Sequence, residues 1–189
     1  GKVGINWARL LTTIGTVTAY GTTVATDAGA IDGALLVHGT PELRKIVEGL
    51  LLQATISEPK VVAEITDLPF PSYAITPTAD KGQAALEVII AFPPEPVVLV
   101  SRTKPQILAA REVLRGAVPS LARAPATSLR KFLKTAEGSY LFAASMVPTD
   151  KMFPAEGPPA RMLKMAGAGS IAIGEKGPDT FVRAELVAA

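Results

Sequence analysis

The only histidine of the chain, His38, is the first residue to consider for chemistry, because an imidazole exchanges protons near neutral pH. It lies between an apolar run and the helix-start signal Thr40-Pro41, a place at which functional groups are often exposed. A catalytic histidine needs a nucleophile or a carboxylate as its partner. The nearest suggestions in the sequence are Asp27, Asp32 and Ser101. None of them forms a catalytic motif with His38, so we interpret His38 as structural and keep catalysis as an alternative.

Residue types that hold metals and cofactors are scarce in this chain. Zinc sites draw on cysteine and histidine, and the chain has no cysteine and one histidine. The acids Glu58, Glu64 and Asp67 show no spacing typical of calcium ligands or of paired hydrolytic carboxylates. Glycines over residues 167–174 precede an expected strand, whereas the glycines of a dinucleotide site follow a strand and open a helix. We therefore predict no metal and no cofactor.

Three basic residues, Arg130, Lys131 and Lys134, fall on one face of a helix expected between Ser128 and Gly138. They are candidates for binding an anion, but the basic side of an amphipathic helix is more often only solvated. The net charge is +2 and aromatic residues make up 5% of the chain. Because nucleic-acid binders need a basic surplus or stacking side chains, we expect no nucleic-acid partner.

A long proline-rich loop over residues 148–159 contains two apolar residues, Met152 and Phe153. Connections of this length are often functional. These two side chains are therefore our candidates for contact with a ligand or a partner. The alternative is that they pack against the protein's own core.

The element that organises the chain is the stretch of residues 85–116. Apolar residues alternate from Leu86 to Phe92, as in a half-buried strand, and prolines then end the strand. A second apolar run, residues 97–100, predicts a buried strand. The capping-box pair Thr103 and Gln106 starts a helix that Gly116 ends.

Further elements are expected on both sides of this stretch. Helices are predicted near residues 7–14, 41–54, 129–136 and 161–165, from apolar residues at helical spacing. Strands are predicted over residues 16–26, 34–37, 61–65, 73–76, 140–146, 171–174 and 181–187. In the last strand we expect Val182, Ala184 and Leu186 to point inward, with Arg183 and Glu185 toward solvent.

These elements predict a single α+β domain over residues 1–189, with a largely antiparallel sheet and amphipathic helices packed on one face. Residues 35–40 and 98–103 share one pattern at a spacing of 63 residues. In each segment a strand is followed by a two-residue bend and then by a threonine that starts a proline-containing helix. Duplication would make two related β-α-β-β-like halves, about 16–84 and 85–189. The alternative is that the two segments are unrelated and share the pattern because caps and prolines recur at helix starts for physical reasons.

Composition indicates a globular chain with a substantial core, because hydrophobic residues make up 48% and charged residues 19%. No apolar run reaches the ~18 residues of a transmembrane helix. The oligomeric state is not predicted. The chain begins with Gly1, which agrees with removal of an upstream segment such as a signal peptide.

Four segments, residues 96–101, 109–116, 120–121 and 138–144, resemble uncharacterised exported bacterial proteins of the Planctomycetes and Verrucomicrobia group. The resemblance implies an exported setting, in the periplasm or cell envelope or outside the cell, and no known activity. The residues themselves leave a cytoplasmic location open.

Our first functional hypothesis is a non-catalytic exported binding or interaction domain with a protein partner. The second is a carrier of an apolar small molecule, held in a deep pocket between sheet and helices. The third is a hydrolase-type enzyme that uses His38 with a carboxylate. A large flat apolar patch would favour the first hypothesis.

Overall fold

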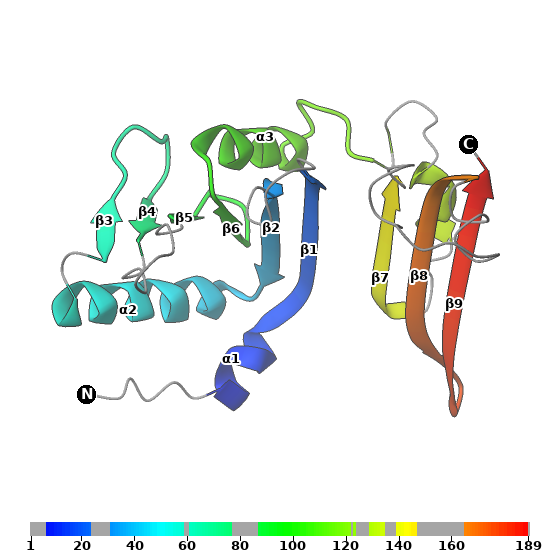
Figure 1. Ribbon diagram of the computed structural model, residues 1–189. Helices are drawn as coiled ribbons and strands as arrows, with labels where there is room; N and C mark the ends of the chain where they lie inside the picture. The colour runs from blue at the N-terminus through cyan, green and yellow to red at the C-terminus, as the bar shows by residue number, and fades with distance from the viewer. Residues whose placement is uncertain are drawn as a thin grey trace, which may run out of the picture. The chain divides into compact units, whose positions relative to one another are not determined.

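The computed structural model describes residues 7–23, 31–58, 61–76, 87–121, 123, 129–134, 139–146 and 165–188. The chain divides into two compact units, Gly1–Ala117 (unit 1) and Val118–Ala189 (unit 2) (Figure 1). The sequence predicted one domain with halves that meet at residues 84 and 85. That position lies inside unit 1.

Unit 1 is built on a six-stranded antiparallel sheet with strand order β1-β2-β6-β5-β4-β3. Its elements in chain order are α1 (Trp7–Thr13), β1 (Ile14–Thr23), β2 (Ile31–Gly39), α2 (Pro41–Ser57), β3 (Val62–Glu64), β4 (Ser72–Ile75), β5 (Val88–Ala91), β6 (Val97–Ser101) and α3 (Lys104–Leu114). The predicted α+β class with a largely antiparallel sheet is confirmed.

The stretch β5–β6–α3 forms the centre of unit 1, as expected. Strand β6 pairs with β5 on one side and with β2 on the other. Thr103 occupies the N-cap position of α3, but its side chain makes no capping hydrogen bond. The predicted capping box is therefore absent. Gly116 follows the helix with a φ of 75°, the left-handed conformation that favours glycine at a helix end.

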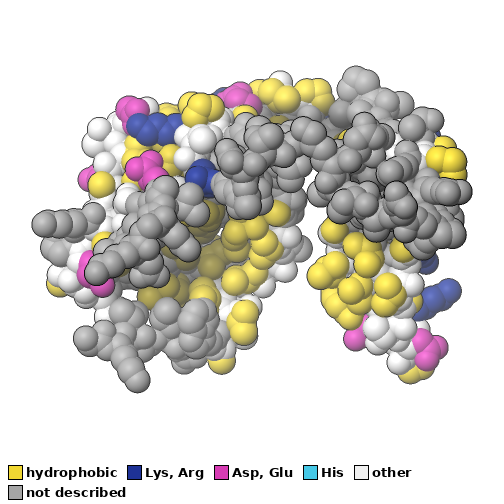
Figure 2. All heavy atoms as spheres, viewed as in Figure 1, with side chains coloured by type: hydrophobic (Ala, Val, Ile, Leu, Met, Phe, Trp, Pro, Cys, Tyr) yellow, Lys and Arg dark blue, Asp and Glu magenta, His cyan; other side chains and the backbone are white. Residues whose placement is uncertain are grey.

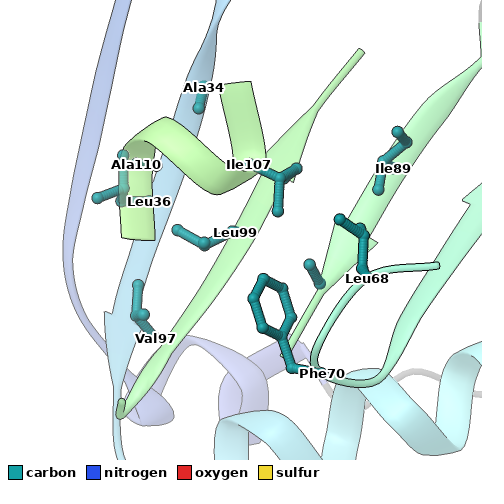
Figure 3. Packing of buried hydrophobic residues seen from close by; sticks show 10 residues of the cluster. Ala34, Leu36, Leu68, Phe70, Ile89, Val97, Leu99, Ile107 and Ala110 are labelled. Atoms are coloured by element: carbon teal, nitrogen blue, oxygen red, sulfur yellow. The ribbon is translucent and has the colours of Figure 1, made fainter. Parts of the chain in front are cut away.

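Two hydrophobic clusters cover the two faces of this sheet. Alternate residues of β6 point to opposite sides, so that Leu99 belongs to one cluster and Val98 to the other. Ile107 of α3 packs with Leu99, together with the loop between β3 and β4 (Figure 3). Leu43 of α2 packs with Val98. The helices therefore lie on both faces of the sheet, and the expectation of one face needs this correction.

The proposed repeat can be examined through the pairing of β2 with β6. Leu36 lies opposite Leu99, and these residues are separated by the 63 positions of the sequence pattern. A local two-fold axis perpendicular to the sheet would relate such a pair, but it would leave both following helices on one face. Because α2 and α3 lie on opposite faces, this axis does not relate the two strand–helix motifs.

Unit 2 contains a three-stranded antiparallel sheet with strand order β7-β8-β9. Its described elements are the 3₁₀ helix η1 (Leu129–Lys134), β7 (Ser139–Met146), β8 (Ala166–Lys176) and β9 (Asp179–Ala188). The predicted closing hairpin is confirmed, with Gly177 in the turn at a φ of 64°. Strand β8 begins several residues earlier than predicted. The helix expected after Ser128 is a short 3₁₀ helix.

The helix predicted near residues 161–165 falls outside the described residues, apart from its last position. None of the helices among the described residues is both long and apolar enough to cross a membrane.

Candidate functional site

His38 lies near the end of β2, half-buried, opposite Thr16 of β1 and Val97 of β6. Ser101 lies opposite Ala34, four residues or ~13 Å away along the strand. The Ser101 hydroxyl donates a hydrogen bond to the Gly33 carbonyl at 2.6 Å. The structure therefore does not bring His38 and Ser101 together.

The other suggested partners of His38 do not complete a catalytic site among the described residues. Asp32 is on β2 itself, six residues from His38, and Asp27 lies outside the described residues. Within the part of the chain that the structure describes, no three histidine or acidic side chains gather as metal ligands.

The acids Glu58, Glu64 and Asp67 have separate positions in unit 1. Glu58 is the C-cap residue of α2, and Glu64 lies opposite Tyr73. Lys104 donates hydrogen bonds to both Asp67 carboxylate oxygens, at 2.8 and 2.7 Å. These bonds from Lys104 lower the pKa of Asp67. Asp67 thus ties the loop between β3 and β4 to the start of α3.

The basic residues after Ser128 lie on η1, where three residues make a turn. Positions 131 and 134 therefore share one side of the backbone, and position 130 lies a third of a turn away. Arg130 and Lys131 are exposed. The three positions therefore span about 120° around the 3₁₀ helix, and their binding of an anion stays a prediction. Met152 and Phe153 lie outside the described residues.

A small pocket lies beside the proline turn between β5 and β6. Its volume is about 200 Å³, and it is lined by Thr40, Pro41, Leu43 and Arg44 together with residues 93–98. Ligand sites usually occupy ~300–1,000 Å³. The Arg44 guanidinium carbon lies 5.5 Å from the centre of the Phe92 ring, and Arg44 pairs with Glu48 at 2.8 Å.

On the other face of the sheet, a second arginine stacks on a second phenylalanine. The Arg111 guanidinium carbon lies 5.0 Å from the Phe70 ring centre. Its Nε lies 4.0 Å from Oε2 of Glu95, and both atoms are buried without a hydrogen-bond partner among the described residues. The sequence analysis missed both arginines. We take them as packing residues that hold the proline turn from its two sides.

The most unusual surface of the described residues is in unit 2, where the two faces of β8 differ in side-chain size. One face of β8 carries small residues, and they are buried: Ala166, Ala168, Ser170, Ala172 and Gly174. Helix η1 contacts β7 and β8, and its Phe132 is only 1% exposed. Small residues let a helix approach a sheet closely. The small-residue face is therefore the covered face.

The opposite face carries the large aliphatic residues and is exposed. We call it the open face, and it consists of Leu141, Ala143, Ile171, Ile173, Val182, Ala184 and Leu186. The exposed fractions are 68% for Val182, 49% for Leu186, 48% for Leu141 and 42% for Ile171. In Figure 2 hydrophobic side chains gather over β7 and β8, with charged side chains at the margin.

The expectation that Val182, Ala184 and Leu186 point into the core is wrong. Their alternation with Arg183 and Glu185 was recognised correctly, because successive side chains of a strand point to opposite faces. The pattern of β9 alone does not say which face another element covers. That choice follows from the small residues of β8, and the sequence analysis considered the glycines of residues 167–174 only as a possible dinucleotide site.

Comparisons of this chain with protein-family models, with curated proteins and with solved structures gave no match.

Proposed function

We propose that this chain is a non-catalytic interaction module that binds a second copy of itself through the open face. The observation that carries this proposal is the exposure of large aliphatic side chains on a sheet face whose reverse side is packed. Exposed apolar patches of this kind mark interaction surfaces in soluble proteins.

The chemistry of the open face favours an identical surface as its partner. None of its seven residues carries a charge. Glu175, the next residue on this side of β8, is exposed at the turn end of the strand, so that the ion-free part of the face consists of these seven residues. In the middle row Ile171 lies between Ala143 and Ala184, which leaves space on both sides of the larger side chain. Two such sheets can pack about 10 Å apart with their side chains interleaved.

The size of the face sets the strength that we expect. The open face has seven residues, compared with ~20–30 residues per partner in a standard stable interface. The proposed contact is therefore a reversible dimer whose population depends on concentration.

Sedimentation velocity over a series of concentrations tests this proposal. Val182→Lys places a charge on the open face at a position that is 68% exposed, so the fold tolerates it. We expect self-association to weaken by roughly tenfold or more, because the charge would be buried in the dimer. The matched control is Leu52→Lys on α2, where the side chain is 63% exposed.

Leu52→Lys is expected to associate like the parent chain. The proposal is wrong if the parent chain is monomeric throughout the series, or if Val182→Lys and Leu52→Lys have the same effect.

An exported setting is part of the same proposal and rests on the resemblance of residues 96–101 and 138–144. To test the exported location, cells that express the gene natively are fractionated, and the chain is detected in each fraction with an antibody. Recovery from the envelope or the medium is expected, and recovery from the cytoplasm alone would contradict it.

A further inference from the structure

The two edges of the unit 1 sheet are protected very differently. At one edge, β3 is three residues long and ends in Glu64. At the other edge, β1 is ten residues long, contains neither a charged residue nor a proline, and pairs among the described strands only with β2. Soluble proteins normally guard an edge strand with charges, prolines or short length. Strand β1 has none of these features.

Strand β1 is nevertheless held firmly in the sheet. After an irregularity between Ile14 and Thr16, its register with β2 is continuous to Thr23. The Tyr20 hydroxyl lies 3.5 Å from the carbonyl and side-chain oxygens of Gln106 on α3. The Thr13 carbonyl, just before β1, accepts a hydrogen bond from the Thr40 N–H at 2.9 Å. The outer edge of β1 is therefore extended along its continuous pairing with β2.

We infer that β1 pairs antiparallel with β1 of a second copy, joining two six-stranded sheets edge to edge. This interface lies in unit 1, does not involve the open face, and goes beyond the proposed function. A two-fold axis through Thr18 would place Thr16 opposite Tyr20 and Val17 opposite Ala19. Aromatic–β-branched and threonine–threonine pairs are favourable across strands.

The absence of charge makes β1 complementary to itself. In a two-fold pairing, the residue on the axis meets its own symmetry mate, so that a charge at that position would face a like charge. Residues 14–23 contain no such charge. The residues Gly15 to Gly21 are all exposed, so that no described side chain has to move before a new strand adds.

The experiment uses Val182→Lys as the background, because this change weakens the open-face contact and leaves β1 intact. We expect the background protein to form a dimer in sedimentation velocity. Adding Thr18→Lys or Thr18→Glu should each shift it to a monomer, with association weaker by roughly tenfold or more. Mixing the two double variants should restore a dimer, since lysine then faces glutamate across the axis.

The control in the same background is Ala109→Lys, which adds the same charge on the exposed side of α3. Ala109→Lys is expected to leave the dimer unchanged. Circular dichroism and thermal unfolding check that each variant is folded, and the restored dimer checks it independently.

Three outcomes would overturn the inference. They are a monomeric background protein, a Thr18→Lys variant that associates as strongly as the background, and a mixture of the charge variants that stays monomeric. A monomeric background that captures an extended uncharged peptide would instead assign the edge to a different occupant. The open-face proposal fails if the single variant Val182→Lys has the same effect on self-association as Leu52→Lys. This result is separate from the Thr18 results, so the failure of one proposal can be told from the failure of the other.

Discussion

At the scale of single residues, the contact between Asp67 and Lys104 shows how an exposed ion pair can position a loop. The loop between β3 and β4 carries Leu68 and Phe70 into the core beside α3. Lys104 is the first residue of α3 and bonds both oxygens of Asp67. The contact fixes where the loop meets the helix. It needs no catalytic explanation, although sequence reasoning considered Asp67 for one.

The pH dependence of this contact gives the first prediction. Because the Asp67 pKa is lowered from 3.8 in the folded protein, the stabilisation is present above that ordinary value and is lost as pH falls through the lowered pKa. In Lys104→Ala the Asp67 pKa should rise toward 3.8, and this part of the acid sensitivity of unfolding should disappear. Titration of the carboxyl carbon by NMR measures the pKa directly.

Arg115→Ala is the control for this prediction, since Arg115 pairs with Glu112 and not with Asp67. An unchanged Asp67 pKa in Lys104→Ala would mean that the lysine does not set it.

The second prediction concerns Gly33, where two neighbouring strands approach too closely for a side chain. A Cβ atom at this position would collide with the Tyr20 carbonyl oxygen of β1. Gly33→Ala should therefore lower the free energy of unfolding by about 1–3 kcal/mol, as overpacking does. Gly49→Ala on α2 has open space around its new Cβ. This change should raise the free energy of unfolding by about 0.5–1 kcal/mol.

Chemical denaturation of both glycine variants gives the comparison. Equal effects at the two positions would show that the close approach at Gly33 is relieved at no cost.

At the scale of elements, the unit 2 sheet is defined by which of its faces is covered. The third prediction compares one change on both faces. Ala172 is fully buried on the covered face, and Ala184 is exposed on the open face. Ala172→Val should destabilise unit 2 by about 1–3 kcal/mol through overpacking, whereas Ala184→Val should leave its stability nearly unchanged. Urea unfolding followed by circular dichroism measures both, and the reverse order of effects would show that the faces are assigned wrongly.

The elements themselves were largely predictable from the sequence. Alternation at Leu86 to Phe92 and the break at the prolines identified β5 and β6, because those patterns follow directly from backbone geometry. The side of the sheet that each helix covers was not predictable. It depends on contacts between distant segments, such as Leu43 with Val98 and Ile107 with Leu99.

The candidate site was predictable only in part, for the same reason. The alternation of Val182, Ala184 and Leu186 identified a face correctly, but its exposure depends on η1 and on the small residues of β8. His38 stood out because it is the only histidine, and the structure shows Ser101 four residues along the strand pair from it. Residue type indicates what chemistry is available, and the fold decides which groups meet.

At the scale of the whole molecule, the two proposed contacts lie in different units and bind identical surfaces. A chain with two such contacts can join two further copies, so association need not stop at a dimer. The fourth prediction is that the parent chain grows beyond a dimer as concentration rises, whereas Val182→Lys, which keeps only the β1 contact at full strength, stops at a dimer. Mass photometry and light scattering follow the growth, and a strict dimer limit in the parent chain would contradict it.

Chemical crosslinking at the open face tests the central claim most directly. The chain has no cysteine, so Ile171→Cys introduces a single reactive thiol in the middle row of the face. A short bismaleimide should then join two copies of Ile171→Cys into a covalent dimer in high yield, while the exposed control Leu52→Cys should remain largely uncrosslinked. Equal yields for the two variants, or no covalent dimer from Ile171→Cys, would contradict the claim that this face binds its own copy.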